Sequence, residues 1–75
     1  MSTRVYPVII RKGESGFFVA ECPSITGCFS QGETIPAALE NIREAMSLCL
    51  EVMKDRGEIW PEPATTLLSE VAVEV

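Results

Sequence analysis

The 75-residue sequence contains no histidine, the side chain used most often as a general acid or base near neutral pH. No serine lies beside a plausible base, so the sequence shows no nucleophile–base pair for covalent catalysis either. The glutamates at positions 40, 44, 51 and 58 fit the solvated face and the end of a helix. The sequence therefore predicts a protein that is not an enzyme.

The sequence has three cysteines, Cys22, Cys28 and Cys49, which are too few and too unevenly spaced for a metal or redox site. A structural zinc site needs four thiolate or imidazole ligands in short paired spacings. Cys22 and Cys28 are too far apart for a C-x-x-C redox pair, and an odd number of thiols cannot close a disulfide framework. We predict buried thiols in a reducing compartment, with no metal and no cofactor.

Long apolar runs are absent, and nothing approaches the roughly 20 residues that a membrane-spanning helix needs. The N-terminal segment contains one basic residue, Arg4, and an apolar run broken by Pro7, without the small-residue cleavage site of a secretory signal. The sequence predicts a cytoplasmic protein with no membrane contact. It also predicts one domain over residues 1–75, with residues 1–3 disordered.

Basic residues are few, six against eleven acidic ones, and the net charge is −5. Such a surface repels the phosphate backbone and removes the attraction behind non-specific nucleic-acid binding. It suits a basic protein partner instead, because complementary potentials speed encounter and align the two surfaces. We expect no direct contact with DNA or RNA.

Three segments rich in β-branched or aromatic residues predict strands: 4–12 (RVYPVIIRK), 16–22 (GFFVAEC) and 28–32 (CFSQG). The glycine-containing KGESG between the first two predicts a hairpin. Pro7 lacks an N–H donor, which favours an edge position for the first strand. Apolar residues on both faces of these strands predict a helix on one side and partial cover, such as a partner subunit, on the other.

A long amphipathic helix is predicted over residues 35–56. Thr34 is a favourable N-cap, Pro36 falls in the first turn, and Gly57 follows the last turn. The apolar residues of the helix recur at three- and four-residue steps and form one stripe. Its members are Ile35, Ala38, Leu39, Ile42, Met46, Cys49, Leu50 and Met53.

The segment after the helix begins with a proline-containing connector, residues 57–66, in which we expect Trp60 to fold back onto the core. Residues 70–75 alternate Glu or Ala with Val, the pattern of a half-buried strand. The predicted fold class is therefore α+β. We expect a single small domain of order β-β-β-α-β, with an antiparallel sheet and one long helix packed on it.

The stretch CPSITGCFSQGET, residues 22–34, places two glycines in front of the helix. Their spacing matches neither a Walker A loop nor a G-x-G-x-x-G fingerprint, so turn formation is favoured. The backbone N–H groups that follow Thr34 leave open a small-anion site at the start of the helix.

This stretch, together with the helix and the later WPEP, resembles the HicB family of antitoxins. In the family's pattern an aromatic strand ends in Pro, and a short turn leads to Gly-Cys and a polar strand. Gly-Asp/Glu-Thr then opens a helix that carries Ala-Leu-x-Asn-Ile-x-Glu-Ala. The matching positions are Pro23, Gly27, Cys28, Gly32, Glu33, Thr34, Ala38, Leu39, Asn41, Ile42, Glu44 and Ala45.

The resemblance implies a partial RNase H-like domain that lacks that fold's catalytic carboxylates and acts by covering a HicA-type toxin. HicA toxins are small basic RNA-cleaving proteins, and the acidic balance of this chain fits such a partner. The resemblance also implies a homodimer or homotetramer. Many HicB proteins carry a C-terminal DNA-binding module, which we expect to be missing because the sequence stops at Val75.

We expect part of the toxin contact at the acidic end of the helix and in the connector, at Glu51, Asp55, Glu58, Trp60 and Glu62. For Trp60 the competing interpretation is a purely structural cap on the core. Two competing functions also stay open. One is a toxin-less oligomer with a structural or ligand-sensing role, and the other is a degenerate RNase H-like nuclease.

Overall fold

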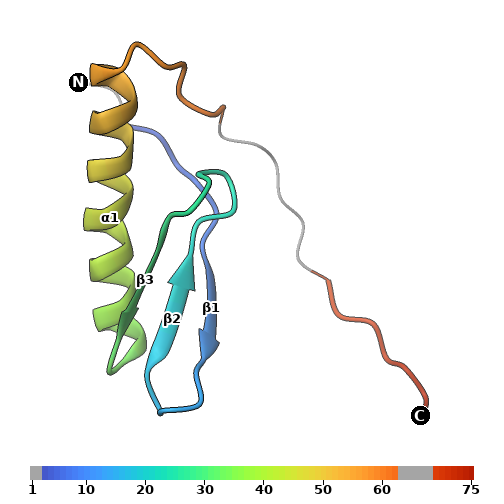
Figure 1. Cartoon of the computed structure of the whole chain (residues 1–75). Helices are drawn as coiled ribbons and strands as arrows, with labels where there is room; N and C mark the ends of the chain where they lie inside the picture. Colours follow the sequence, from blue (N-terminus) through green and yellow to red (C-terminus); the bar gives the residue numbers. More distant parts are fainter. Residues whose placement is uncertain (1–2, 63–68) are drawn as a thin grey trace.

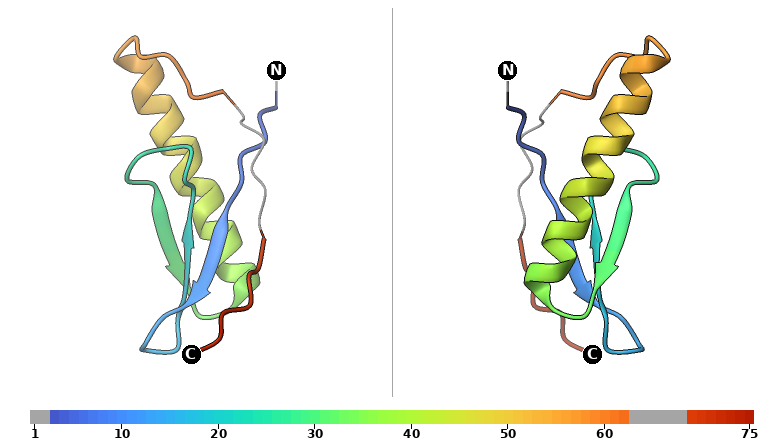
Figure 2. Two further views of the ribbon diagram at one scale, coloured as in Figure 1. Left: turned by 90° about the vertical axis from the view of Figure 1, so that its right-hand side faces the viewer. Right: turned by 90° about the vertical axis from the view of Figure 1, so that its left-hand side faces the viewer.

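The computed structural model describes residues 3–62 and 69–75, which form a three-stranded sheet and one long helix (Figure 1). The elements follow in the order β1 (Ile9–Lys12), β2 (Phe18–Glu21), β3 (Phe29–Gly32) and α1 (Ile35–Asp55). Both strand pairs are antiparallel, and the sheet order is β1-β2-β3. Helix α1 lies on one face of the sheet and crosses it diagonally (Figure 2). The predicted α+β arrangement of three strands and one helix is confirmed.

The sheet has one face toward α1 and one face open to solvent. Ala20 of β2 pairs with Ile10 on one side and Ser30 on the other, and Ala20 is fully buried. Because side chains alternate along a strand, Glu21 and its partners Ile9 and Phe29 point to the opposite face. There Ile9 and Phe29 are exposed. Among the described residues β1 pairs with β2 alone, which matches the expected edge position of the first strand. The strand is shorter than predicted, since β1 begins at Ile9 and Pro7 lies before it.

Both ends of α1 are capped by local interactions that the sequence predicted. The Thr34 hydroxyl accepts the Ala37 N–H at 3.1 Å. At the other end Gly57 has φ of 72°, a left-handed conformation that glycine adopts without strain. Its N–H donates to the Lys54 carbonyl at 3.0 Å. Among the described residues, no helix is long and apolar enough to cross a bilayer.

The core lies between α1 and the sheet and extends under the β2–β3 loop. It consists of Tyr6, Ala20, Cys22, Ile25, Cys28, Ala38 and Ile42. A Cβ atom added at Gly32 would stand 2.5 Å from the backbone nitrogen of Ala38, so β3 and α1 approach too closely there for any side chain. The prediction of buried thiols holds for Cys22 and Cys28, while Cys49 is half-buried.

The expected last strand is not formed among the residues that the structure describes. Residues 69–75 have no strand pairing, and Val71 and Val73 are 81% and 74% exposed. Figure 1 shows this segment in red, running away from the sheet and the helix. Alternation alone does not make a strand, because its backbone donors and acceptors need an adjacent sheet edge. The predicted disorder of residues 1–3 and the end of the predicted connector fall largely outside the described residues.

Candidate protein-binding site

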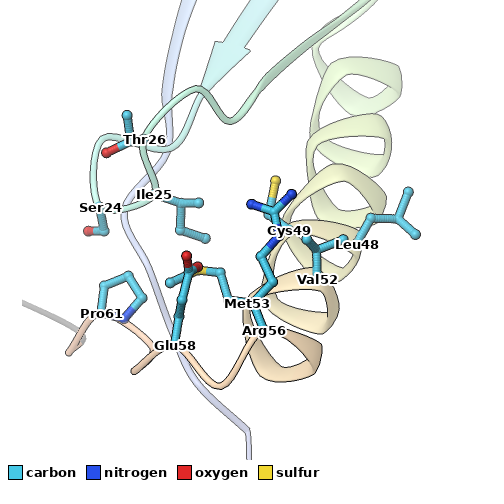
Figure 3. A pocket seen from close by; sticks show the side chains of 10 residues that line it. All are labelled: Ser24, Ile25, Thr26, Leu48, Cys49, Val52, Met53, Arg56, Glu58 and Pro61. Carbon is cyan, nitrogen blue, oxygen red and sulfur yellow. The ribbon is translucent and has the colours of Figure 1, made fainter.

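A groove of about 520 Å³ lies between the C-terminal half of α1, the β2–β3 loop and the start of the connector. Figure 3 shows Ile25 of the loop pointing toward Cys49 and Met53 on the helix side. Its lining is formed by Ser24, Ile25, Thr26, Leu48, Cys49, Val52, Met53, Arg56, Glu58 and Pro61. Three segments distant in sequence therefore build one concave surface.

The helix side of this groove is apolar and exposed. Leu48 and Val52, one turn apart, are 63% and 46% exposed. Across the groove Ile25 is buried and anchors the β2–β3 loop to the core. Exposed leucine and valine beside a preformed hollow are typical of a surface that binds another molecule.

Leu48 and Val52 fall outside the apolar stripe predicted from the sequence. A signal was present, since two apolar residues four positions apart continue a helix face. The predicted stripe contains neither Leu48 nor Val52, because it follows the helix face expected to pack against the core. The position of the sheet decides which apolar face of a helix is buried. This position is known only from the tertiary structure.

Two of the predicted contact residues, Glu51 and Asp55, lie on the C-terminal half of α1 but are not among the side chains that line the groove. Glu51 follows Leu48 by three positions and Asp55 follows Val52 by three, so each acid lies about one turn beyond an exposed apolar side chain. Both carboxylates are exposed. The charged side chains that line the groove itself are Arg56 and Glu58.

The other predicted contact residues gather at a second hollow of about 360 Å³. Its lining is formed by Arg4, Lys54, Gly57, Glu58, Ile59, Trp60 and Glu62. Glu58 lines both hollows, so the two adjoin at this residue. The second hollow is not uniformly acidic, because Arg4 and Lys54 offset Glu58 and Glu62.

Trp60 is held in place by contacts within the chain. Its indole N–H donates to the Leu50 carbonyl at 2.7 Å, and the Arg4 guanidinium lies 5.2 Å from the ring centroid. The Tyr6 hydroxyl donates to the adjacent Pro61 carbonyl at 2.6 Å. These contacts fasten the connector to α1 and to the N-terminal segment. They match the structural interpretation of Trp60, whose ring is nevertheless half-exposed.

The start of α1 offers little to an anion. Pro36 has no N–H, the Ala37 N–H donates to the Thr34 hydroxyl, and the Ala38 N–H donates to the Thr34 carbonyl at 2.9 Å. The exposed carboxylate of Glu33 adds negative charge next to the cap. The donors that would hold a phosphate are therefore largely used within the chain.

The three thiols meet beneath the β2–β3 loop, between the sheet and α1. The Cys22 N–H donates to the Cys28 carbonyl at 3.0 Å, which brings the two residues side by side. Burial and a hydrogen bond with Cys49 raise the pKa of the Cys28 thiol to about 12. A thiol held protonated in this way is a poor nucleophile and a poor metal ligand. Within residues 3–62 and 69–75, no cluster of ligating side chains suits a metal ion.

Comparison with known proteins places this fold in a family. The sequence model described as HicB-like antitoxin of bacterial toxin-antitoxin system matches residues 6–73, which include all four elements. The chain belongs to the HicB-like antitoxin family. The resemblance noted in the motif of residues 23–45 is thereby confirmed.

Relatives of this HicB-like chain occur in bacteria and archaea. A UPF0150 protein of Thermoplasma acidophilum is 45% identical over 56 residues, covering 75% of this chain and 81% of the relative. One UPF0150 protein of Synechocystis sp. is 43% identical over 51 residues, covering 68% and 74%. A second from the same organism is 44% identical over 63 residues, covering 84% and 77%. Membership of this family supports an antitoxin role, in general terms a non-enzymatic one.

Proposed function

We propose that this HicB-like protein neutralises a HicA-type RNA-cleaving toxin by binding it and covering its active surface. The observation that carries the proposal is the match to the antitoxin family over residues 6–73. The groove along α1 supports it, since it supplies an apolar surface on which a folded partner can be seated.

The charge of the chain supports a basic partner. Glu51 and Asp55 are exposed on the C-terminal half of α1, each three positions after an apolar residue of the groove, and the chain as a whole carries a net charge of −5. An RNA-cleaving protein needs a positive surface to hold the phosphate backbone. Exposed carboxylates on the binding surface would compete for that positive surface and exclude the RNA. Glu58, Trp60 and Glu62 extend the proposed contact toward the second hollow.

The proposal is tested by co-expressing the chain with a small basic reading frame of the HicA type taken from beside its gene, where one is present. We expect growth to be restored and the two proteins to co-purify. The double reversal Glu51→Lys and Asp55→Lys should weaken binding about tenfold or more, because two attractive charges become repulsive. Lysine near the C-terminal end of α1 is favourable for the helix, so the fold is expected to persist.

The matched control is Glu14→Lys, in the exposed turn between β1 and β2 and away from the groove. It changes the net charge in the same direction and should leave binding near that of the unmodified chain. Failure of the unmodified chain to restore growth or to co-purify would overturn the proposed function. Equal binding by the double reversal and the control would place the contact elsewhere.

The same experiment distinguishes the proposed function from the alternative of a toxin-less oligomer. A chain that assembles with itself but gives no rescue with any neighbouring toxin frame would favour it. The ligand-sensing form of this alternative is weakened by the use of the α1 N-terminal donors within the chain. Absence of thermal stabilisation by phosphate or nucleotides would remove it.

A further inference from the structure

The groove along α1 has three walls, and the walls are held in different ways. One wall is α1 itself, and another is the β2–β3 loop, whose Ile25 is buried in the core. The Ile25 N–H donates to the Cys22 carbonyl at 3.2 Å, and the Cys28 N–H donates to the Ile25 carbonyl at 3.2 Å. Core packing and backbone bonds therefore fix these two walls.

The third wall is the start of the connector, which contributes Glu58 and Pro61 to the groove. None of residues 57–62 is buried. The Glu58 N–H still donates to the Met53 carbonyl of α1 at 2.9 Å, but among the described residues no backbone–backbone hydrogen bond holds residues 59–62. The position of this wall thus depends on side chains that bond to its backbone and on the side chain of Trp60.

The Pro61 carbonyl accepts two of these hydrogen bonds, both from the N-terminal segment. The Tyr6 hydroxyl donates to it at 2.6 Å in a partly buried setting, and the Arg4 guanidinium donates at 3.2 Å in an exposed one. Water competes with an exposed donor, whereas a hydrogen bond shielded from water is stronger. Tyr6 is therefore the main restraint on the groove residue Pro61.

Tyr6 is out of reach of a partner seated in the groove. The residue is 7% exposed, belongs to the core cluster and lines neither of the two hollows. A folded partner would contact Pro61 but not the tyrosine behind it. Any effect of the Tyr6 hydroxyl on binding has to be transmitted through the connector.

We propose that Tyr6 is a positioning residue for the groove, because its hydroxyl holds the Pro61 carbonyl and keeps the connector in place as the third wall. This inference rests on the proposed function, in which a HicA-type toxin is seated in the groove. A wall that is already in place does not have to be ordered when the partner binds, and ordering it would lower the affinity. Tyr6 thus raises the affinity from within the core.

The variant Tyr6→Phe tests the proposal in the full chain, with the dissociation constant for the purified toxin measured by calorimetry. The substitution removes the hydroxyl and retains the ring, so the core stays filled. The dissociation constant should rise about fivefold or more, since the partner now has to order the connector.

Thr34→Ala is the matched control. It also removes a hydroxyl that bonds to the backbone, but at the end of α1 opposite to the groove. The dissociation constant of this variant should stay near that of the unmodified chain. An unchanged affinity in Tyr6→Phe, or an equal loss of affinity in both variants, would overturn the role of Tyr6.

A second measurement needs no toxin. Trp60 is the single tryptophan of the chain and directly precedes Pro61. Quenching of its fluorescence by acrylamide should increase in Tyr6→Phe, because the connector moves more freely, and should not change in Thr34→Ala. Equal quenching in Tyr6→Phe and the unmodified chain would overturn the proposal. An unmodified chain that binds no toxin would overturn the proposed function instead, and the quenching would then decide by itself whether Tyr6 holds the connector.

Discussion

Trp60 donates its indole N–H to the backbone carbonyl of Leu50 at 2.7 Å, across the turn that ends α1. The bond ties the connector to the helix ten residues earlier. It also orients the ring so that Arg4 stacks on it. One side chain thereby joins the helix, the connector and the N-terminal segment.

Two replacements of Trp60 distinguish the stability contributed by its hydrogen bond from that contributed by its ring. Trp60→Phe should lower the free energy of unfolding by about 1 kcal/mol, because the Leu50 carbonyl loses a donor while much of the packing remains. Trp60→Ala should cost more, about 2 kcal/mol, since the ring is also lost. Denaturant unfolding followed by circular dichroism measures both. Full stability of Trp60→Ala with loss of toxin binding would instead assign Trp60 to the interface.

Gly32→Ala should destabilise the fold by about 2 kcal/mol or more. The added Cβ would lie 2.5 Å from the Ala38 nitrogen and 2.8 Å from the Ala37 carbonyl carbon, and backbone atoms cannot move aside alone. Gly13→Ala is the milder comparison and should cost less, because its Cβ would have one tight contact, with the Phe17 backbone oxygen at 3.3 Å, and an ordinary one with a Val19 methyl at 3.7 Å. A melting temperature equal to that of Gly13→Ala would contradict the close approach of β3 and α1.

Thr34→Ala should lower the free energy of unfolding by about 1 kcal/mol, because the Ala37 N–H loses its acceptor at the start of α1. Thr34→Ser retains the hydroxyl and should remain near the unmodified stability. Thermal unfolding followed by circular dichroism measures both changes. If serine and alanine were equally destabilising, the methyl group of Thr34 rather than the cap would be responsible.

Stability should fall as pH rises from about 9 toward 12. In the folded chain burial raises the pKa of the Cys28 thiol from 9.0 to about 12, whereas the unfolded chain keeps the ordinary value. In this window the unfolded chain releases the proton and the folded chain retains it, so unfolding becomes more favourable with rising pH. Denaturant titrations at several pH values measure the slope.

Other groups titrate in the same range, so the Cys28→Ala variant provides the reference. The decline in stability with pH should be shallower in the variant by the contribution of this one thiol. At pH 8 a thiol reagent should label Cys28 only after unfolding, because the residue is 2% exposed and protonated. Parallel pH profiles for the two proteins, or rapid labelling of Cys28 in the folded chain, would refute this account.

The limits of helix α1 could be predicted because the signals at its ends are local. Thr34 and Gly57 act on neighbouring backbone groups, and their effects need no knowledge of the rest of the fold. The binding groove could not be predicted in the same way. It joins Ile25 of a loop to Leu48 and Val52 of the helix, and only packing brings these residues together.

The sequence by itself determined the order of three strands and a helix, the capped limits of α1, the acidic balance and the family motif. These follow from side-chain alternation, backbone capping and composition, which act over a few residues. The tertiary structure decided that Trp60 caps α1, that Leu48 and Val52 face a groove, and that segment 69–75 pairs with no strand among the described residues. Each depends on which surfaces meet across the fold, because a side chain or strand edge is buried only where another part of the protein covers it.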